Sequence, residues 1–153
     1  MFETADIFSV VGSKQKAFAT LEKGLKLSLA NNDFYQACKF LDSLVLNSLY
    51  SNDVSTATDY LEQMAKYDPN HQFLPEYTLG KAIISAYQNQ PEVSEKLFAQ
   101  LDKMKSYSSF ILPRWETTIA ERNMDWQRMI DLNRELLELT AKKIFVMHCP
   151  PFI

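Results

Sequence analysis

Apolar residues recur along most of this chain at the three- and four-residue spacing that places side chains on one face of a helix. Between residues 13 and 30 the apolar positions are Ala17, Leu21, Leu25 and Leu29. Short polar segments such as Asn31-Asn32-Asp33 interrupt the pattern with residues typical of helix ends. The pattern predicts seven helices, at about residues 13–30, 34–50, 54–67, 75–88, 91–105, 113–122 and 126–143.

The few turn-forming residues agree with an all-α fold. The chain has 3 glycines and 6 prolines, and every proline falls at a proposed helix end or in the C-terminal segment. A β-rich fold of this length would use more turn residues. Asp33 followed by Gln36, and Asp53 before the next apolar stripe, are typical of helix N-caps.

Small residues near the start of alternate helices indicate an internal repeat. Ala17, Ala57 and Ser94 follow one another at intervals of 40 and 37 residues, and Met129 takes the same place 35 residues later. A unit of two helices that recurs at such intervals is typical of α-solenoids.

Three segments resemble the tetratricopeptide repeat family. NDVSTATDYLEQMAKYDPNH at 52–71 and MDWQRMIDLNRELLELT at 124–140 resemble its second helix, and YTLGKAIISAY at 77–87 resembles a first helix with Leu79-Gly80 in the leucine-glycine place. The first-helix glycine is absent in the other two units, where Val45 and Thr117 stand. The resemblance implies an all-α right-handed superhelix of three to four helical hairpins over residues 13–143, with degenerate repeats.

Two terminal segments flank the repeat region. Residues 1–12 are expected to form an N-terminal segment, with a short docked helix as one reading, and residues 144–153 an apolar tail, IFVMHCPPFI. The tail either folds back over the last hairpin or forms an interface, such as that of a homodimer. A third reading makes the chain one piece of a larger repeat protein.

Charge and composition narrow the classes of partner. The net charge of −3 and pI near 5.4 give no electrostatic case for nucleic acid or an anionic membrane. No run of about 18 apolar residues is present, so no membrane span is expected. Of the 2 cysteines, Cys38 lies on an apolar stripe and is predicted to be a buried thiol, which fits a reducing, cytoplasmic setting.

The sequence offers little for catalysis or for a cofactor. His71 lies in a predicted turn, and the adjacent His148 and Cys149 are too few for a structural zinc site. The glycines are isolated, so no phosphate-binding loop is present. Carboxylate pairs on one helical turn, such as Asp59 with Glu62 and Glu135 with Glu138, are expected on exposed faces. We expect no enzyme activity, no metal and no cofactor.

The large apolar side chains on the stripes are expected in the core. This expectation covers the aromatic residues Phe18, Phe40, Tyr60, Tyr87, Phe98 and Trp126, and the methionines Met64, Met104, Met124 and Met129 as gap fillers.

The resemblance also implies where a partner would bind, because first helices line the concave face of such a stack. The residues there would be Lys39, Asp42, Leu46, Tyr50, Tyr77, Lys81, Ile84, Arg114, Thr118 and Arg122. Lys81, Arg114 and Arg122 would form a basic strip for peptide carboxylates. The family's carboxylate clamp is not reproduced.

The leading hypothesis is therefore a non-enzymatic scaffold that binds a protein or peptide in the groove of a tetratricopeptide-like stack. The alternatives are a regulatory sensor domain whose curvature responds to a peptide, and a self-associating structural fragment of a larger repeat protein.

Overall fold

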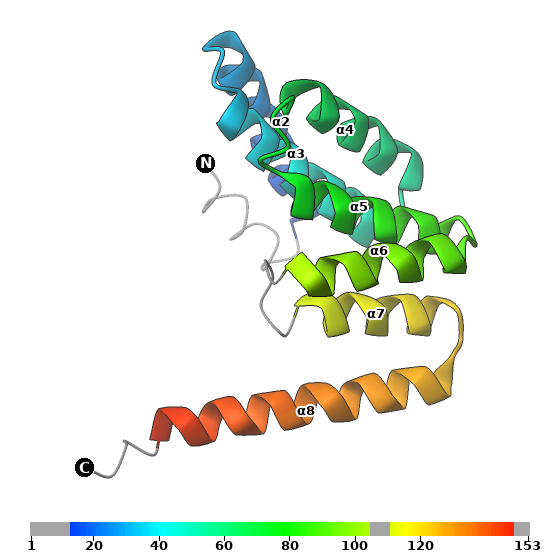
Figure 1. Ribbon diagram of the computed structural model, residues 1–153. Coiled ribbons are helices and arrows are strands. Elements are labelled where there is room, and N and C mark those ends of the chain that lie inside the picture. The colour runs from blue at the N-terminus through cyan, green and yellow to red at the C-terminus, as the bar shows by residue number, and fades with distance from the viewer. Residues whose placement is uncertain (1–12, 105–110, 149–153) are drawn as a thin grey trace. The chain divides into compact units, whose positions relative to one another are not determined.

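Seven α-helices and no strand make up the part of the chain that the computed structural model describes, which is residues 13–104 and 111–148, with side chains of 13–104 and 112–141. The prediction of an all-α chain is confirmed (Figure 1). The helices are α2 Lys14–Ala30, α3 Phe34–Tyr50, α4 Val54–Tyr67, α5 Leu74–Tyr87, α6 Pro91–Met104, α7 Ile111–Arg122 and α8 Trp126–His148.

Two helix ends differ from the prediction. Helix α7 begins at Ile111, which leaves Pro113 in the first turn, where its missing N–H is tolerated. Helix α8 continues through residues 144–148 instead of ending near Lys143, since neither glycine nor proline interrupts the chain before Pro150. The first half of the predicted tail is therefore helical. The predictions for residues 1–12 and 149–153 lie outside the described residues.

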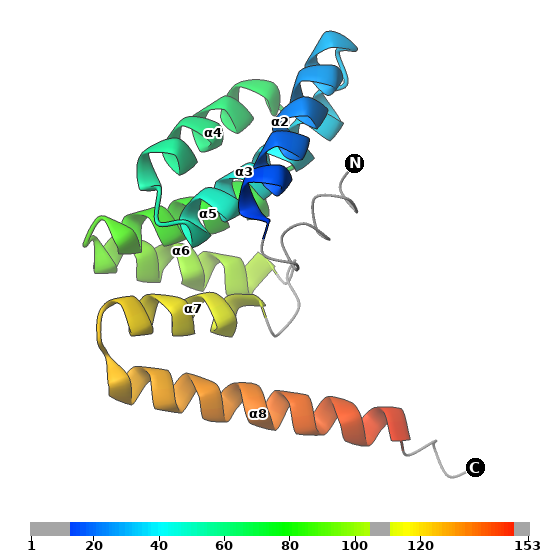
Figure 2. The same ribbon diagram turned by 180° about the vertical axis from the view of Figure 1, so that it is seen from behind.

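The chain divides into two compact units, Met1–Leu97 and Phe98–Ile153. In the first unit α3 packs against α2, α4 and α5, and α5 also packs against α4, as Figures 1 and 2 show from opposite sides. In the second unit α7 packs against α8.

The core of the first unit comes from the predicted apolar stripes. Helices α2 and α4 contribute one buried stripe each, whereas α3 and α5 are buried over a wider part of their surface. Ala17 and Ala57, the small residues of the predicted repeat, are fully buried. Burial of apolar surface stabilises the fold by roughly 25 cal/mol per Å². The fully buried large side chains of this unit are Leu21, Leu41, Leu44, Val45, Leu49, Met64, Leu79 and Ile83.

Two glycines allow the helices of the first unit to approach closely. A Cβ atom on Gly24 would overlap the ring of Phe40 from α3. A Cβ atom on Gly80 would lie 3.0 Å from Leu61 Cδ1 and 3.2 Å from Val45 Cγ1. The glycine that the sequence placed at residue 80 therefore lies where α5 meets both α3 and α4.

Four connections between helices share one hydrogen-bond pattern. In the turn at residues 31–33, the N–H of Asn32 donates to the carbonyl of Leu29 and the N–H of Asp33 donates to the carbonyl of Ser28. This is the Schellman motif, whose central residue takes a positive φ. The turns at residues 51–53, 88–90 and 123–125 repeat both bonds. In these four turns the residues with positive φ are Asn32 (55°), Asn52 (62°), Asn89 (58°) and Met124 (55°).

The last residue of three of these turns also caps the next helix. The carboxylates of Asp33, Asp53 and Asp125 accept hydrogen bonds of 3.0–3.1 Å from the backbone N–H three residues later. The predicted caps at Asp33 and Asp53 are confirmed. Each of these three turns therefore pairs backbone groups that the helix before it and the helix after it would otherwise leave without a hydrogen-bond partner.

The second unit buries less of its apolar stripe than the sequence predicts. Trp115 and Ala120 of α7 and Leu132 of α8 are buried, and the two helices pack against each other. Trp126 and Met124, predicted in the core, are 57% and 72% exposed, so those predictions are wrong. Both lie at the turn into α8, and periodicity alone does not reveal whether a neighbouring helix covers a side chain at that place. An ion pair of 2.7 Å between Arg128 and Glu116 joins the two helices.

We predict that Gly24→Ala destabilises the first unit by about 1–2 kcal/mol. The overlap with the buried Phe40 ring costs more than the roughly 1 kcal/mol that alanine gains in a helix. Urea unfolding followed by circular dichroism measures the change. In a Phe40→Leu background the same substitution should be neutral or stabilising, and equal destabilisation in both backgrounds would contradict the packing argument.

We predict that Met124→Gly stabilises the turn between α7 and α8 by about 1 kcal/mol, because a side chain at φ 55° is strained and this one is largely exposed. Hydrogen exchange of the amides that donate to the Ala120 and Glu121 carbonyls would slow. Met124→Ala is the matched control, since it removes the side chain and keeps a Cβ atom. Equal exchange rates in the two variants would refute a backbone origin.

Candidate functional site

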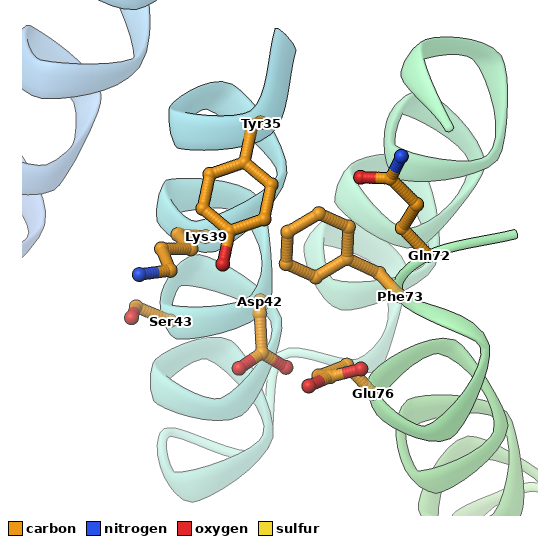
Figure 3. A pocket seen from close by; sticks show the side chains of 7 residues that line it. All are labelled: Tyr35, Lys39, Asp42, Ser43, Gln72, Phe73 and Glu76. Carbon is orange, nitrogen blue, oxygen red and sulfur yellow. The ribbon is translucent and has the colours of Figure 1, made fainter. Parts of the chain in front are cut away.

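An open pocket of about 470 Å³ lies between α3 and the start of α5 (Figure 3). Seven side chains line it: Tyr35, Lys39, Asp42 and Ser43 from α3, Gln72 and Phe73 from the preceding connection, and Glu76 from α5. The pocket thus combines aromatic walls with charged and polar groups, a combination typical of binding sites.

The spacing along α3 explains one side of the pocket. Tyr35, Lys39 and Asp42 stand four and three residues apart, so they share one helical face. That face borders the buried stripe of Leu41 and Leu44. Exposure therefore decreases along this face toward the core. Tyr35 is 51% exposed, whereas Asp42 is partly buried.

The carboxylate of Asp68 positions the residues on the other side of the pocket. Asp68 Oδ1 accepts the N–H of Gln72 at 2.8 Å, and Asp68 Oδ2 accepts the N–H of Phe73 at 2.7 Å. Between Asp68 and Gln72, His71 adopts a positive φ of 54°, which turns the chain. The sequence identified Asp68-Pro69-Asn70 as a turn but did not reveal that Asp68 positions two residues of a pocket.

Tyr35 lies between an aromatic ring and a cation. Its ring centroid is 5.2 Å from that of Phe73, with the planes tilted by 50°, and Lys39 Nζ lies 5.0 Å from the Tyr35 centroid. Phe73 is buried, so it fixes the inner side of the Tyr35 ring. Such contacts contribute about 0.5–1.5 kcal/mol each and hold the wall in place.

Two carboxyl groups form the floor of the pocket. Figure 3 shows Asp42 and Glu76 pointing toward one another from α3 and α5. Glu76 Oε2 is buried and has no hydrogen-bond partner among the described residues. Burial, and then the negative charge of Glu76, raise the pKa of Asp42 from 3.8 to about 7. Asp42 therefore keeps its proton to a higher pH than an ordinary aspartate does.

The residues proposed from the sequence fall in different places. Lys39 and Asp42 line the pocket, whereas Tyr50 and Lys81 are exposed outside it. Tyr77 packs against the core cluster. Ile84, expected to face a partner, is 6% exposed, so that expectation is wrong, because α5 is buried on more sides than one stripe accounts for.

Leu46, on α3, is half-buried and does not line the pocket. The last three proposed residues, Arg114, Thr118 and Arg122, belong to α7 in the second unit, where the Thr118 hydroxyl donates to the Arg114 carbonyl at 3.1 Å. Lys81 belongs to the first unit, so the basic strip proposed with Arg114 and Arg122 stays a prediction.

Sequence reasoning missed Tyr35, Ser43, Gln72, Phe73 and Glu76. Tyr35 could have been predicted from the sequence, because it stands one helical turn before Lys39. The carboxylates that the sequence paired, Asp59 with Glu62 and Glu135 with Glu138, are all exposed as expected.

The predicted buried thiol is confirmed. Cys38 is 1% exposed, and its Sγ lies 4.0 Å from the carbonyl oxygen of Met64, to which the thiol donates. Burial, and then the charge of Asp68, raise the pKa of the thiol to about 11, so Cys38 stays protonated near neutral pH.

Two kinds of feature are absent from the described residues. Residues 13–104 and 111–148 hold no group of three or more His, Cys, Asp or Glu that could bind a metal ion. In the same ranges, a helix of the length and hydropathy needed to cross a membrane is not found.

We predict that Asp42→Asn stabilises the protein by at least about 1 kcal/mol at pH 8 and has little effect at pH 4. The folded pKa of about 7 exceeds the ordinary 3.8, so the folded chain binds this proton more tightly than the unfolded chain. Stability therefore falls as the pH rises between these values, by about 1.4 kcal/mol for each pKa unit at most. Urea unfolding at pH 4, 6 and 8 checks this.

Asp59→Asn, on the exposed surface of α4, is the matched control and should show no such pH dependence. An Asp42→Asn effect that is the same at pH 4 and pH 8 would contradict the assigned cause.

Comparisons with known proteins do not supply a function. No protein-family model matches the chain, and neither a curated protein nor a solved structure similar to it was found. The pocket between α3 and α5 is therefore the feature from which a function can be inferred.

Proposed function

We propose that this chain is a non-enzymatic module that binds a protein or peptide, with the pocket between α3 and α5 as its anchoring site. The fold that accompanies the proposal is a tetratricopeptide-like stack of helical hairpins. The observation that carries it is the placement of the half-exposed Tyr35 against the buried Phe73, above polar and charged groups, in one open pocket.

The aromatic wall suits recognition of a polypeptide. A tyrosine provides a large contact area with few rotatable bonds, so little conformational entropy is lost on binding. Tyr35 already has its ring held by Phe73 and Lys39. Because the wall is preorganised, we expect binding with little change in the backbone.

The pocket favours binding over catalysis. A carboxyl group with a pKa near 7 has a value that suits a general acid or base. A hydrolytic site would add an activated nucleophile or a cluster of oxyanion donors. The pocket residues other than the two carboxyls are two aromatic side chains, one lysine, one serine and one glutamine, and the lysine lies over the Tyr35 ring. We therefore propose that the two carboxyl groups take part in recognition of the partner and not in catalysis.

Selection from a peptide display library tests the proposal. The full chain should select peptides whose affinity falls at least tenfold with Tyr35→Ala, since removing the ring removes the main contact surface of the wall. Tyr50→Ala is the matched control, because Tyr50 is on the same helix, is equally exposed at 50%, and lies outside the pocket.

The two tyrosine variants separate the outcomes. Affinities that stay within about twofold for Tyr50→Ala would support the pocket as the anchor. Failure to select any peptide, or loss of affinity with Tyr50→Ala and not with Tyr35→Ala, would overturn the proposal.

A further inference from the structure

We infer that the pocket accepts an arginine side chain of the bound segment, with its guanidinium placed against the carboxyls of Asp42 and Glu76. This inference rests on the proposed function, and it names the chemistry that the partner must present.

The first support is the unpaired oxygen in the floor. Glu76 Oε2 is buried without a hydrogen-bond partner among the described residues. Buried polar atoms are almost always paired, and leaving one unpaired costs about 1–3 kcal/mol, or more for a charged group. A donor that enters from the open side of the pocket would satisfy this oxygen.

The second support is the local charge. Asp42 and Glu76 approach each other, while the one cationic side chain among the seven that line the pocket, Lys39, lies over the Tyr35 ring. Figure 3 shows the Lys39 ammonium directed away from both carboxyls. The floor therefore has an excess of negative charge that the pocket itself does not neutralise.

The third support is the shape and character of the walls. Tyr35 and Phe73 present aromatic surface next to the carboxyls. A guanidinium is planar, weakly hydrated and able to stack on aromatic rings while it donates two parallel hydrogen bonds to carboxylates. The volume of about 470 Å³ lies within the range of about 300–1,000 Å³ that is usual for ligand pockets.

A metal ion fits the same pocket less well. Calcium takes six to eight oxygen ligands, and magnesium requires a near-octahedral set. The described part of the chain provides no group of three or more His, Cys, Asp or Glu, and the pocket provides two carboxyls beside apolar rings. An organic cation uses both the carboxyls and the rings, whereas a metal ion uses the carboxyls alone.

Binding of the cation should displace a proton. The charged groups around Asp42 in the pocket are Lys39 on α3 and Glu76 on α5, and α2 and α4 contribute none to the lining. Before a cation binds, burial and then the nearby charge of Glu76 favour retention of a proton on Asp42. When the guanidinium binds, the Asp42 proton leaves to solvent and the O–H group becomes a carboxylate that accepts from the cation. Affinity should therefore rise with pH, by about tenfold from pH 6 to pH 8.

NMR titration with N-acetyl-arginine methylamide tests the inference directly. We expect saturable shifts of Tyr35 and Phe73 resonances, with tighter binding at pH 8 than at pH 6. N-acetyl-citrulline methylamide, which has almost the same shape and no charge, should not bind. N-acetyl-lysine methylamide, with a free side-chain ammonium, should bind more weakly, because an ammonium cannot form two parallel bonds.

Glu76→Gln should weaken binding of the arginine probe at least tenfold, because it keeps the side-chain size and removes the charge. Glu62→Gln, on the exposed surface of α4, is the matched control and should leave affinity unchanged. Circular dichroism would verify that both variants fold. Equal binding of arginine and citrulline probes, unchanged affinity in Glu76→Gln, or tighter binding of calcium chloride than of arginine would overturn the inference.

The titration and the library selection fail independently. Peptides that depend on Tyr35 but contain no arginine would overturn the inference and leave the proposed function standing. Saturable binding of the arginine probe without any selected peptide would support a site for an organic cation and count against the proposed function.

Discussion

The burial of α3 is the constraint on which the first unit depends. Helix α3 packs against α2, α4 and α5, and Ala37, Leu41 and Leu44 are fully buried. A helix enclosed on most sides presents only a narrow edge to solvent. In α3 that edge carries Tyr35 and Lys39, and the partly buried Asp42 follows them on the same face. The position of the pocket is thus a consequence of how the core is packed, since α5 must lie close to α3 for Glu76 to reach Asp42. The contact of Gly80 with Val45 and Leu61 shows how closely α5 approaches.

The carboxyl pair opposes the stability that this packing provides. Burial and mutual repulsion make ionised Asp42 unfavourable, and Glu76 Oε2 lacks a partner in the same place. Sites that bind a ligand often hold groups that are unfavourable until the ligand arrives, because optimal stability would remove them. On this view the strain in the floor and the affinity for a cation have one origin, and neither can be changed without the other.

The helices could be predicted from the sequence, because periodicity, prolines and Asp caps all act within a few residues of one another. Asp33 and Asp53 are examples, since each caps the helix that follows it. The site could be predicted only in part, because it depends on contacts between helices. Lys39 and Asp42 were implied by the resemblance, as exposed positions of a first helix, whereas Glu76 becomes their neighbour only through the packing of α5. The role of Asp68 is local, but the turn signal at Asp68-Pro69-Asn70 did not show that its carboxylate accepts from Gln72 and Phe73. Periodicity likewise could not show that Trp126 is exposed.

The connections between helices bear on how such a chain can change during evolution or engineering. In the four turns of Schellman type, every residue takes part in ending one helix or starting the next, so an inserted residue would break several bonds at once. The connection between α4 and α5 is different: it spans residues 68–73, uses the Asp68 side chain as its brace, and delivers Gln72 and Phe73 to the pocket. A change at this connection therefore alters the lining of the pocket directly, whereas a change in the other four turns alters how two helices are joined. New specificity could arise at this connection while the order and spacing of the helices stay unchanged.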